Sequence, residues 1–242
     1  MLQRYFLEVS YKGEGFSGFQ SQDNAVTIQS EIEKAFTILQ RAPIEMTGSS
    51  RTDAGVHALQ NFLHFDFADE LNPQFVYKMN AILPSAIVVK SIRKVDAEAH
   101  CRFDAHSRYY QYFLYQHKDP FLEDRAYYFP YNIDESLLNE AASIVKSYSD
   151  FTSFSKRNTQ VKTFQCSIMQ SEWVREGDCI IYKVRANRFL RGMVRALVAT
   201  MLQVGRGKIT LDEFKQIIEA KDCTKASFAV PAHGLFLTQV EL

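Results

Sequence analysis

The order of strand-like and helix-like segments constrains the fold of this chain more than any other feature. In the first half, alternating or β-branched apolar residues predict strands, and apolar residues that recur every three to four positions predict helices. The expected strands are residues 5–11, 43–49, 59–67 and 86–95, and the expected helices begin at Thr27 and Pro73. This half therefore has the order β-α-β-β-α-β, which is typical of a ferredoxin-like unit.

The second half repeats that order. The expected strands are residues 107–116, 165–175, 179–187 and 235–240, and the expected helices are residues 134–148, 189–204 and 211–220. The loop 118–132 is rich in aromatic residues and proline and has no assignment. We therefore predict an α+β protein with two tandem ferredoxin-like units, residues 1–105 and 106–242, whose mainly antiparallel sheets join into a platform with helices on one face.

The distribution of charge limits the kind of partner. The 242 residues include 28 basic and 28 acidic ones, and a neutral protein is not expected to coat nucleic acid over its whole surface. Between Cys179 and Leu211, however, there are seven basic residues and no acidic one. This local excess suits a polyanion bound in a cleft. The alternative is an unrelated set of solvated faces whose counter-charges lie elsewhere in the sequence.

The sequence favours a cytoplasmic protein without a metal site. The N-terminal residues lack the pattern of a secretory signal, and no apolar run is long enough to cross a bilayer, so no membrane partner is expected. The four cysteines are scattered without a C-x-x-C pair, which predicts reduced thiols and no metal site.

The run GSSRTDAGVHA, residues 48–58, contains the carboxylate with the most distinctive surroundings, Asp53. Asp followed by Ala-Gly is a good turn sequence, so a purely structural turn is one interpretation. The neighbours of Asp53 are small and polar and have little to bury, which suits a loop that lies over a cleft and approaches a ligand. The residue types alone leave both interpretations open.

Several runs together resemble the TruA family of tRNA pseudouridine synthases. GSSRTDAGVHA is similar to the active-site motif of that family, and the other similar runs follow in the family's order: YKGEGFSGFQ (11–20), TIQ (27–29), HFD (64–66), RYYQY (108–112), DFTSF (150–154), NRFLRGMVR (187–195) and GLFL (234–237). The departures from the family pattern are Phe19 in place of Trp, Ser50 in place of Gly, and Lys162 in place of Arg.

The resemblance implies that the chain converts uridine to pseudouridine in RNA, in a catalytic cleft between the two halves. Asp53 would be the nucleophile or its equivalent, and Tyr110 would stack on the flipped uracil and move the proton at C5. Arg51 would fill the space that the flipped base leaves, and Leu235 would line the uracil pocket. Gln20, at the end of YKGEGFSGFQ, would also contact the substrate. Neither His57 nor His64 is given an acid–base role.

A guanidinium near Asp53 would keep the carboxylate ionised and aimed. Arg195 is the candidate, because Arg188, Arg191 and Arg195 recur at helical spacing on the helix expected from residue 189. With the resemblance, Arg188 and Arg191 would contact phosphates. Without it, a plain amphipathic helix with a solvated basic face is about equally favoured.

The resemblance further implies that the substrate is tRNA, modified at positions 38, 39 and 40 of the anticodon stem-loop, and that the protein is a homodimer in which tRNA contacts both subunits. The reaction exchanges no electrons and imports no group, so it requires no cofactor. Two alternatives remain: a non-catalytic RNA-binding module built on the same sheets, and a pseudouridine synthase that acts on other RNA positions.

Overall fold

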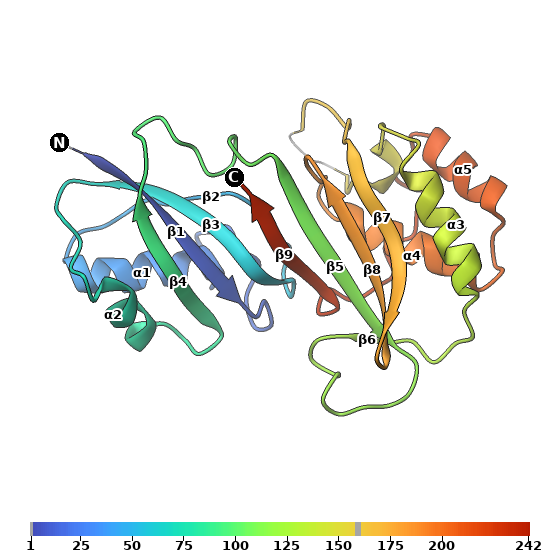
Figure 1. Ribbon diagram of the computed structural model, residues 1–242, viewed down its shortest axis with the longest axis horizontal. Helices are drawn as coiled ribbons and strands as arrows, with labels where there is room; N and C mark the ends of the chain where they lie inside the picture. Colours follow the sequence, from blue (N-terminus) through green and yellow to red (C-terminus); the bar gives the residue numbers. More distant parts are fainter. Residues whose placement is uncertain (1, 158–160) are drawn as a thin grey trace. The chain divides into compact units, whose positions relative to one another are not determined.

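The computed structural model describes residues 2–157 and 161–242. The chain folds into two compact units, of which unit 1 comprises Met1–His106 with Phe236–Leu242 and unit 2 comprises Ser107–Leu235 (Figure 1). Each unit has a mainly antiparallel open sheet, and the described residues form five α-helices in all. The prediction of a mixed protein with antiparallel sheets is confirmed at this level.

Unit 1 places its longest strands at the centre of its sheet. Its elements are β1 (Gln3–Tyr11), α1 (Ile28–Gln40), β2 (Thr47–Gly48), β3 (His57–Phe67), α2 (Phe75–Ile82), β4 (Ile87–Lys94) and β9 (Leu235–Glu241, from Phe236 on). Strand β1 lies between β4 and β3 and is antiparallel to both. The other edge of β3 is antiparallel to β2 near Leu63 and parallel to β9 near His57. The last strand is predicted in the second half, whereas the structure groups it with unit 1 from Phe236 on.

Helix α1 forms where the sequence predicts it. Thr27 is the N-cap, and its side chain and that of Ser30 form a capping box, which satisfies two backbone N–H groups at the start of the helix. The ring of Phe36 on α1 packs edge-on against Phe65 of β3 and Phe75 of α2. Both helices therefore bury their apolar sides on the same face of the sheet.

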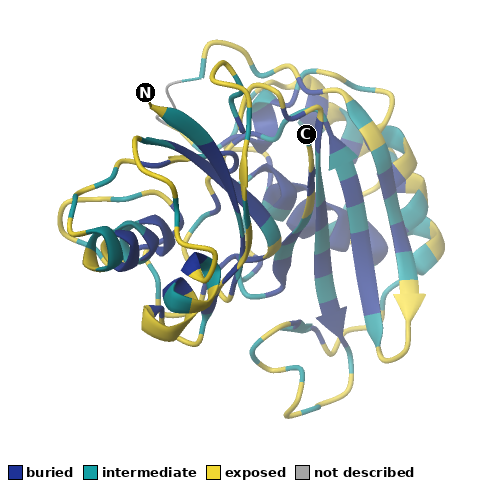
Figure 2. Ribbon diagram, turned by 60° about the vertical axis from the view of Figure 1, so that its left-hand side comes forward, coloured by how far each residue is buried: buried dark blue, intermediate teal, exposed yellow. Residues whose placement is uncertain are grey.

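Unit 2 contains a three-stranded antiparallel sheet with a short additional strand. Its elements are β5 (Ser107–Tyr115), β6 (Tyr127–Tyr128), α3 (Glu135–Val145), a 3₁₀ helix (Thr152–Phe154), β7 (Ile168–Glu176), β8 (Cys179–Ala186), α4 (Met193–Gly205) and α5 (Leu211–Glu219). Strand β8 lies between β5 and β7. Burial alternates along most of β5, where Tyr110, Tyr112 and Leu114 are buried. In Figure 2 most positions in the strands are buried or intermediate, whereas exposed positions are frequent in the connecting loops.

An asparagine on a helix protects the edge strand of each unit. In unit 1, the side-chain amide of Asn80 on α2 accepts the N–H of Val89 on β4 and donates to its carbonyl oxygen, both at 2.8 Å. In unit 2, Asn139 on α3 does the same for Trp173 on β7, at 2.9 and 3.0 Å. Backbone groups at a sheet edge otherwise remain open to pairing with another chain, so these contacts blunt both edges.

The structure corrects several element boundaries. Helix α4 begins at Met193, not at residue 189, because Gly192 adopts φ 75° and breaks the helical backbone. The strand expected at residues 43–49 is only Thr47–Gly48 long, and the unassigned loop 118–132 contains β6. Because α4 starts late, Arg188 and Arg191 lie in the loop between β8 and α4, and their expected helical spacing with Arg195 is wrong.

No helix within the described ranges is long and apolar enough to cross a membrane.

Candidate active site

The segment between β2 and β3 carries Asp53 at the first position of a tight turn. The N–H of Val56 donates to the carbonyl oxygen of Asp53 at 3.1 Å, and Gly55, the third residue of the turn, has φ 78°. A positive φ at that position is the mark of a type II turn and favours glycine. A backbone hydrogen bond therefore closes the turn, and Asp53 is half-buried at its start.

Most residues directly before Asp53 are buried. Ser49, Ser50 and Thr52 are buried, whereas Arg51 is exposed. The expectation that these small polar residues have little to bury is therefore wrong, because all three are buried. Arg51 and Asp53, by contrast, are accessible on the segment, which is what a residue that contacts a ligand requires.

The loop of residues 12–20 packs directly on the Asp53 segment, and its glycines allow this close approach. The N–H of Phe19 donates to the carbonyl oxygen of Thr52 at 3.1 Å. Gly18 has φ 96°, and a Cβ atom there would lie 3.1 Å from the same oxygen. Phe19 is buried against the ring of Tyr11, so its departure from the family pattern is accommodated in the core, whereas Gln20 next to it is exposed.

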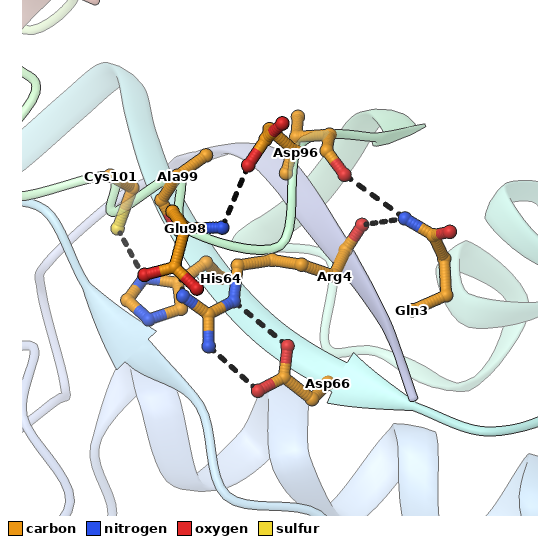
Figure 3. A network of polar contacts seen from close by, with 9 residues as sticks. Gln3, Arg4, His64, Asp66, Asp96, Glu98, Ala99 and Cys101 are labelled. Atoms are coloured by element: carbon orange, nitrogen blue, oxygen red, sulfur yellow. Dashed lines mark hydrogen bonds and ion pairs between the residues drawn. The ribbon is translucent and has the colours of Figure 1, made fainter. Parts of the chain in front are cut away.

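The two histidines of the matched runs have structural partners. The Nδ1 atom of His57 accepts the N–H of Gly13 at 3.1 Å. His64 lies 3.2 Å from the sulfur of Cys101, and burial lowers the pKa of His64 to about 4, assisted by the nearby charges of His100 and Arg4 (Figure 3). Both histidines therefore have structural contacts, and the absence of an acid–base role for them stays a prediction.

Asp66, the last residue of the run HFD, is held in a bidentate ion pair. Arg4 donates from Nε and Nη2 to its two carboxylate oxygens at 2.8 and 2.7 Å, and from Nη1 to the carbonyl oxygen of Ala99 at 3.0 Å (Figure 3). The guanidinium lowers the pKa of Asp66. The ion pair therefore ties β1, β3 and the segment after β4 together, which is a structural role.

In unit 2, Tyr110 meets the loop between β8 and α4. Tyr110 is 9% exposed, and its ring packs edge-on against Phe189 with centroids 5.1 Å apart. Arg188 is half-buried and Arg191 is exposed on the same loop. The carbonyl oxygen of Arg191 accepts the N–H of Lys156 at 3.0 Å, so the loop has a fixed anchor. The structure thus brings Tyr110 and two of the predicted arginines to one region of unit 2.

Arg195 lies in the first turn of α4 and is half-buried. Its Nε and Nη2 atoms donate to the carbonyl oxygen of Val230 at 3.0 and 2.6 Å. Leu235 is buried just after Gly234, whose carbonyl oxygen accepts the N–H of Phe113 on β5 at 2.8 Å. The segment before β9 is therefore attached to both α4 and β5 within unit 2.

The predicted site residues fall into two groups. Asp53, Arg51 and Gln20 belong to unit 1, and Tyr110, Arg188, Arg191, Arg195 and Leu235 belong to unit 2. The pairing of Asp53 with Arg195 joins residues of different units and stays a prediction. Tyr11 and Asn61, which contact the Asp53 segment from within unit 1, are not among the predicted site residues. The polar Asn61 in the apolar run of β3 was the signal that could have revealed this support.

Comparisons with known proteins agree with the resemblance. The family described as tRNA pseudouridine synthase matches residues 8–104 and 148–241. Proteins named tRNA pseudouridine synthase A are similar over 99% of this chain: that of Parabacteroides distasonis is 46% identical with 96% of its length covered, that of Bacteroides thetaiotaomicron 43% with 91%, and that of Staphylococcus aureus 37% with 91%. This chain therefore belongs to the tRNA pseudouridine synthase family.

Proposed function

We propose that this protein isomerises uridine to pseudouridine at positions 38, 39 and 40 of the tRNA anticodon stem-loop, with Asp53 as the catalytic residue. The observation that carries the proposal is the half-buried carboxylate of Asp53, held on a closed backbone turn inside the first family-matched segment. Fixing a reactive group before the substrate arrives removes entropy from the barrier of the reaction.

The reaction exchanges one bond at the ribose for another. The bond between C1′ and N1 of the uracil breaks, the uracil turns, and a bond between C1′ and C5 forms, while C5 loses a proton and N1 gains one. Asp53 either adds to C1′ and is released again, or takes a ribose proton so that a glycal forms and is later reprotonated. In both routes atoms and electrons balance without an added reactant.

The partners of Asp53 would come from unit 2. We propose that the two units are tandem ferredoxin-like domains with the boundary near residue 105, and that the catalytic cleft lies between them. In unit 1 the order β4-β1-β3-β2 agrees with that architecture, and in unit 2 the order β5-β8-β7 does. Arg195 would then pair with the carboxylate of Asp53 and hold it ionised.

The substrate uridine would leave the base stack to reach Asp53, at a cost of a few kcal/mol. Tyr110 would stack on the extruded uracil and move the proton at C5, and Leu235 would line the pocket. Arg51, the exposed neighbour of Asp53, would occupy the vacated space in the stem, with Gln20 contacting the substrate nearby.

Arg188 and Arg191 would contact tRNA phosphates from the loop before α4. Phosphate contacts supply affinity without reading sequence, which suits an enzyme that accepts several tRNAs. We further propose that the protein works in the cytoplasm as a homodimer in which one tRNA touches both subunits.

The test is site-resolved mapping of pseudouridine in tRNA incubated with purified protein and no cofactor. Conversion is expected at positions 38, 39 and 40. Conversion confined to other positions would show that the protein is a pseudouridine synthase with a different target. Unchanged tRNA, bound but not modified, would favour the RNA-binding module. A transcript with cytidine at all three positions is the matched control, because it keeps the phosphates and removes the reacting base.

A further inference from the structure

A buried polar network lies directly behind the Asp53 segment. The hydroxyl oxygen of Tyr11 is 2.8 Å from Oγ1 of Thr52. The side-chain nitrogen of Asn61 donates to that tyrosine oxygen at 3.3 Å and to the carbonyl oxygen of Ser50 at 2.9 Å. Asn61 is 0%, Tyr11 5% and Thr52 7% exposed, so all three groups depend on one another for hydrogen bonds.

The orientation of Asn61 follows from its hydrogen bonds. Oδ1 of Asn61 accepts the N–H of Phe62 at 2.9 Å, which fixes the orientation of the amide and leaves its nitrogen facing Ser50 and Tyr11. Because the amide nitrogen only donates, the oxygen of Tyr11 accepts from it. In the hydrogen bond between Tyr11 and Thr52 either hydroxyl can be the donor, and burial raises the pKa of Tyr11, which keeps its hydroxyl protonated.

Thr52 is thereby held at two atoms. Its Oγ1 is held by Tyr11, and its carbonyl oxygen accepts the N–H of Phe19 at 3.1 Å. The peptide group that includes this carbonyl also includes the nitrogen of Asp53. Fixing Thr52 therefore fixes the start of the turn from which the Asp53 carboxylate projects.

We propose that Tyr11 is a positioning residue for the reaction: its hydroxyl, oriented by Asn61, holds Thr52 and through it sets the aim of the Asp53 carboxylate. This inference rests on the proposed function of Asp53. A misplacement of about 1 Å at a reacting group lowers the rate about 100-fold. Loss of the hydrogen bond between Tyr11 and Thr52 is therefore expected to lower kcat, and not only the stability of the protein.

The first test is Tyr11→Phe, which removes one oxygen atom and keeps the ring. Unit 2 offers a matched control, because the hydroxyl of Tyr182 makes the same kind of buried contact, 2.8 Å from Oγ of Ser171. Tyr11→Phe is expected to lower kcat about 10- to 100-fold with KM changed less than about threefold. Tyr182→Phe is expected to lower Tm by a similar amount and leave kcat as in the wild type.

The second test separates the hydrogen bond from general damage. Thr52→Val removes the same contact from the other side and is expected to lower kcat as Tyr11→Phe does, while Thr52→Ser keeps the hydroxyl and is expected to restore most of the rate. The double variant Tyr11→Phe/Thr52→Val is expected to be little worse than Tyr11→Phe, because both changes break the hydrogen bond between Tyr11 and Thr52. Independent effects that multiply would overturn the proposal.

A measurement that does not use activity keeps this inference separate from the proposed function. Hydrogen–deuterium exchange of the peptide spanning residues 49–56 is expected to quicken in Tyr11→Phe and not in Tyr182→Phe. If the wild type modifies tRNA but Tyr11→Phe keeps full kcat, or if exchange in that peptide does not change, Tyr11 does not position Asp53. If the wild type modifies no RNA while exchange does quicken, the proposed function fails and the structural coupling stands.

Discussion

The guanidinium of Arg195 donates twice to the carbonyl oxygen of Val230, from Nε at 3.0 Å and from Nη2 at 2.6 Å. The segment that contains Val230 makes a second contact with α4, in which the N–H of Ser227 donates to Oγ1 of Thr200 at 3.1 Å. Arg195 is therefore fixed by its own unit, through two of the five N–H donors of its guanidinium. An arginine held in this way can keep one face on a backbone carbonyl and offer another to a carboxylate.

Arg195→Lys is expected to lower kcat/KM about 10- to 100-fold even though the charge is kept, because losing a hydrogen bond to a charged group costs about 1.5–3 kcal/mol. A single ammonium cannot hold the carbonyl oxygen and also form a bidentate pair. Arg185→Lys is the matched control, since the Nε of Arg185 donates to Ser107 on the sheet of unit 2. Equal activity of Arg195→Lys and wild type would remove Arg195 from the mechanism.

Arg191→Gln is expected to weaken tRNA binding without changing kcat. Each lost phosphate contact lowers the salt dependence of binding by about one unit in the slope of log K against log salt. The measurement is the Kd for tRNA over a series of KCl concentrations. Lys208→Gln serves as the control because Lys208 is exposed beyond the opposite end of α4. An unchanged slope in Arg191→Gln would show that this arginine is only a solvated surface residue.

Gly13→Ala is expected to reduce both stability and activity. A Cβ atom at Gly13 would overlap the backbone of Val56, which ends the Asp53 turn, and overpacking of this kind costs about 1–3 kcal/mol. Gly15→Ala is the control from the same loop, because Gly15 has φ 79° but no atom within 4 Å of a built Cβ. That variant is expected to lose stability through backbone strain and to keep kcat. The measurements are thermal unfolding and turnover of both variants. Loss of turnover in Gly15→Ala but not in Gly13→Ala would contradict the prediction.

His64 is expected to make the protein less stable as the pH falls from 6.5 towards 4. Burial lowers the pKa of folded His64 from 6.5 to about 4, so between these values the unfolded chain binds a proton that the folded chain does not. Arg4 lowers the pKa of Asp66, so Asp66 contributes a further loss of stability only when the pH falls below 3.8, the ordinary pKa of an aspartate. Free energies of unfolding measured at several pH values are expected to fall less steeply in His64→Gln. The exposed His117→Gln should keep the wild-type slope, and identical slopes in all three proteins would contradict the assignment.

The sequence predicted most elements because their apolar periodicity and caps are local signals. Thr27 and Asp134 both cap helices where expected, and the alternation along β5 is present in the structure. The start of α4 was misplaced because Leu190 is buried in the loop before the helix and so continues the apolar pattern. The local sequence does not show that Gly192 adopts a positive φ, which breaks the helical backbone before Met193.

The candidate site was predictable only in part. Motifs singled out Asp53 and its exposed neighbour Arg51, because a carboxylate in a glycine-containing turn is visible in the sequence. The support from Tyr11 and Asn61 depends on β1 and β3 pairing side by side, which brings residues about fifty positions apart into contact. Such contacts are set by tertiary packing and leave no periodic trace in the chain.

The most direct test of the account is Asp53→Asn, which keeps the size of the side chain and removes its negative charge. Pseudouridine formation in tRNA is measured with enzyme in excess, alongside the Kd for the same tRNA. The account predicts no pseudouridine above the level without enzyme, with Kd within about threefold of wild type. Pseudouridine formation by Asp53→Asn at the wild-type rate would contradict the assignment of Asp53 as the catalytic residue.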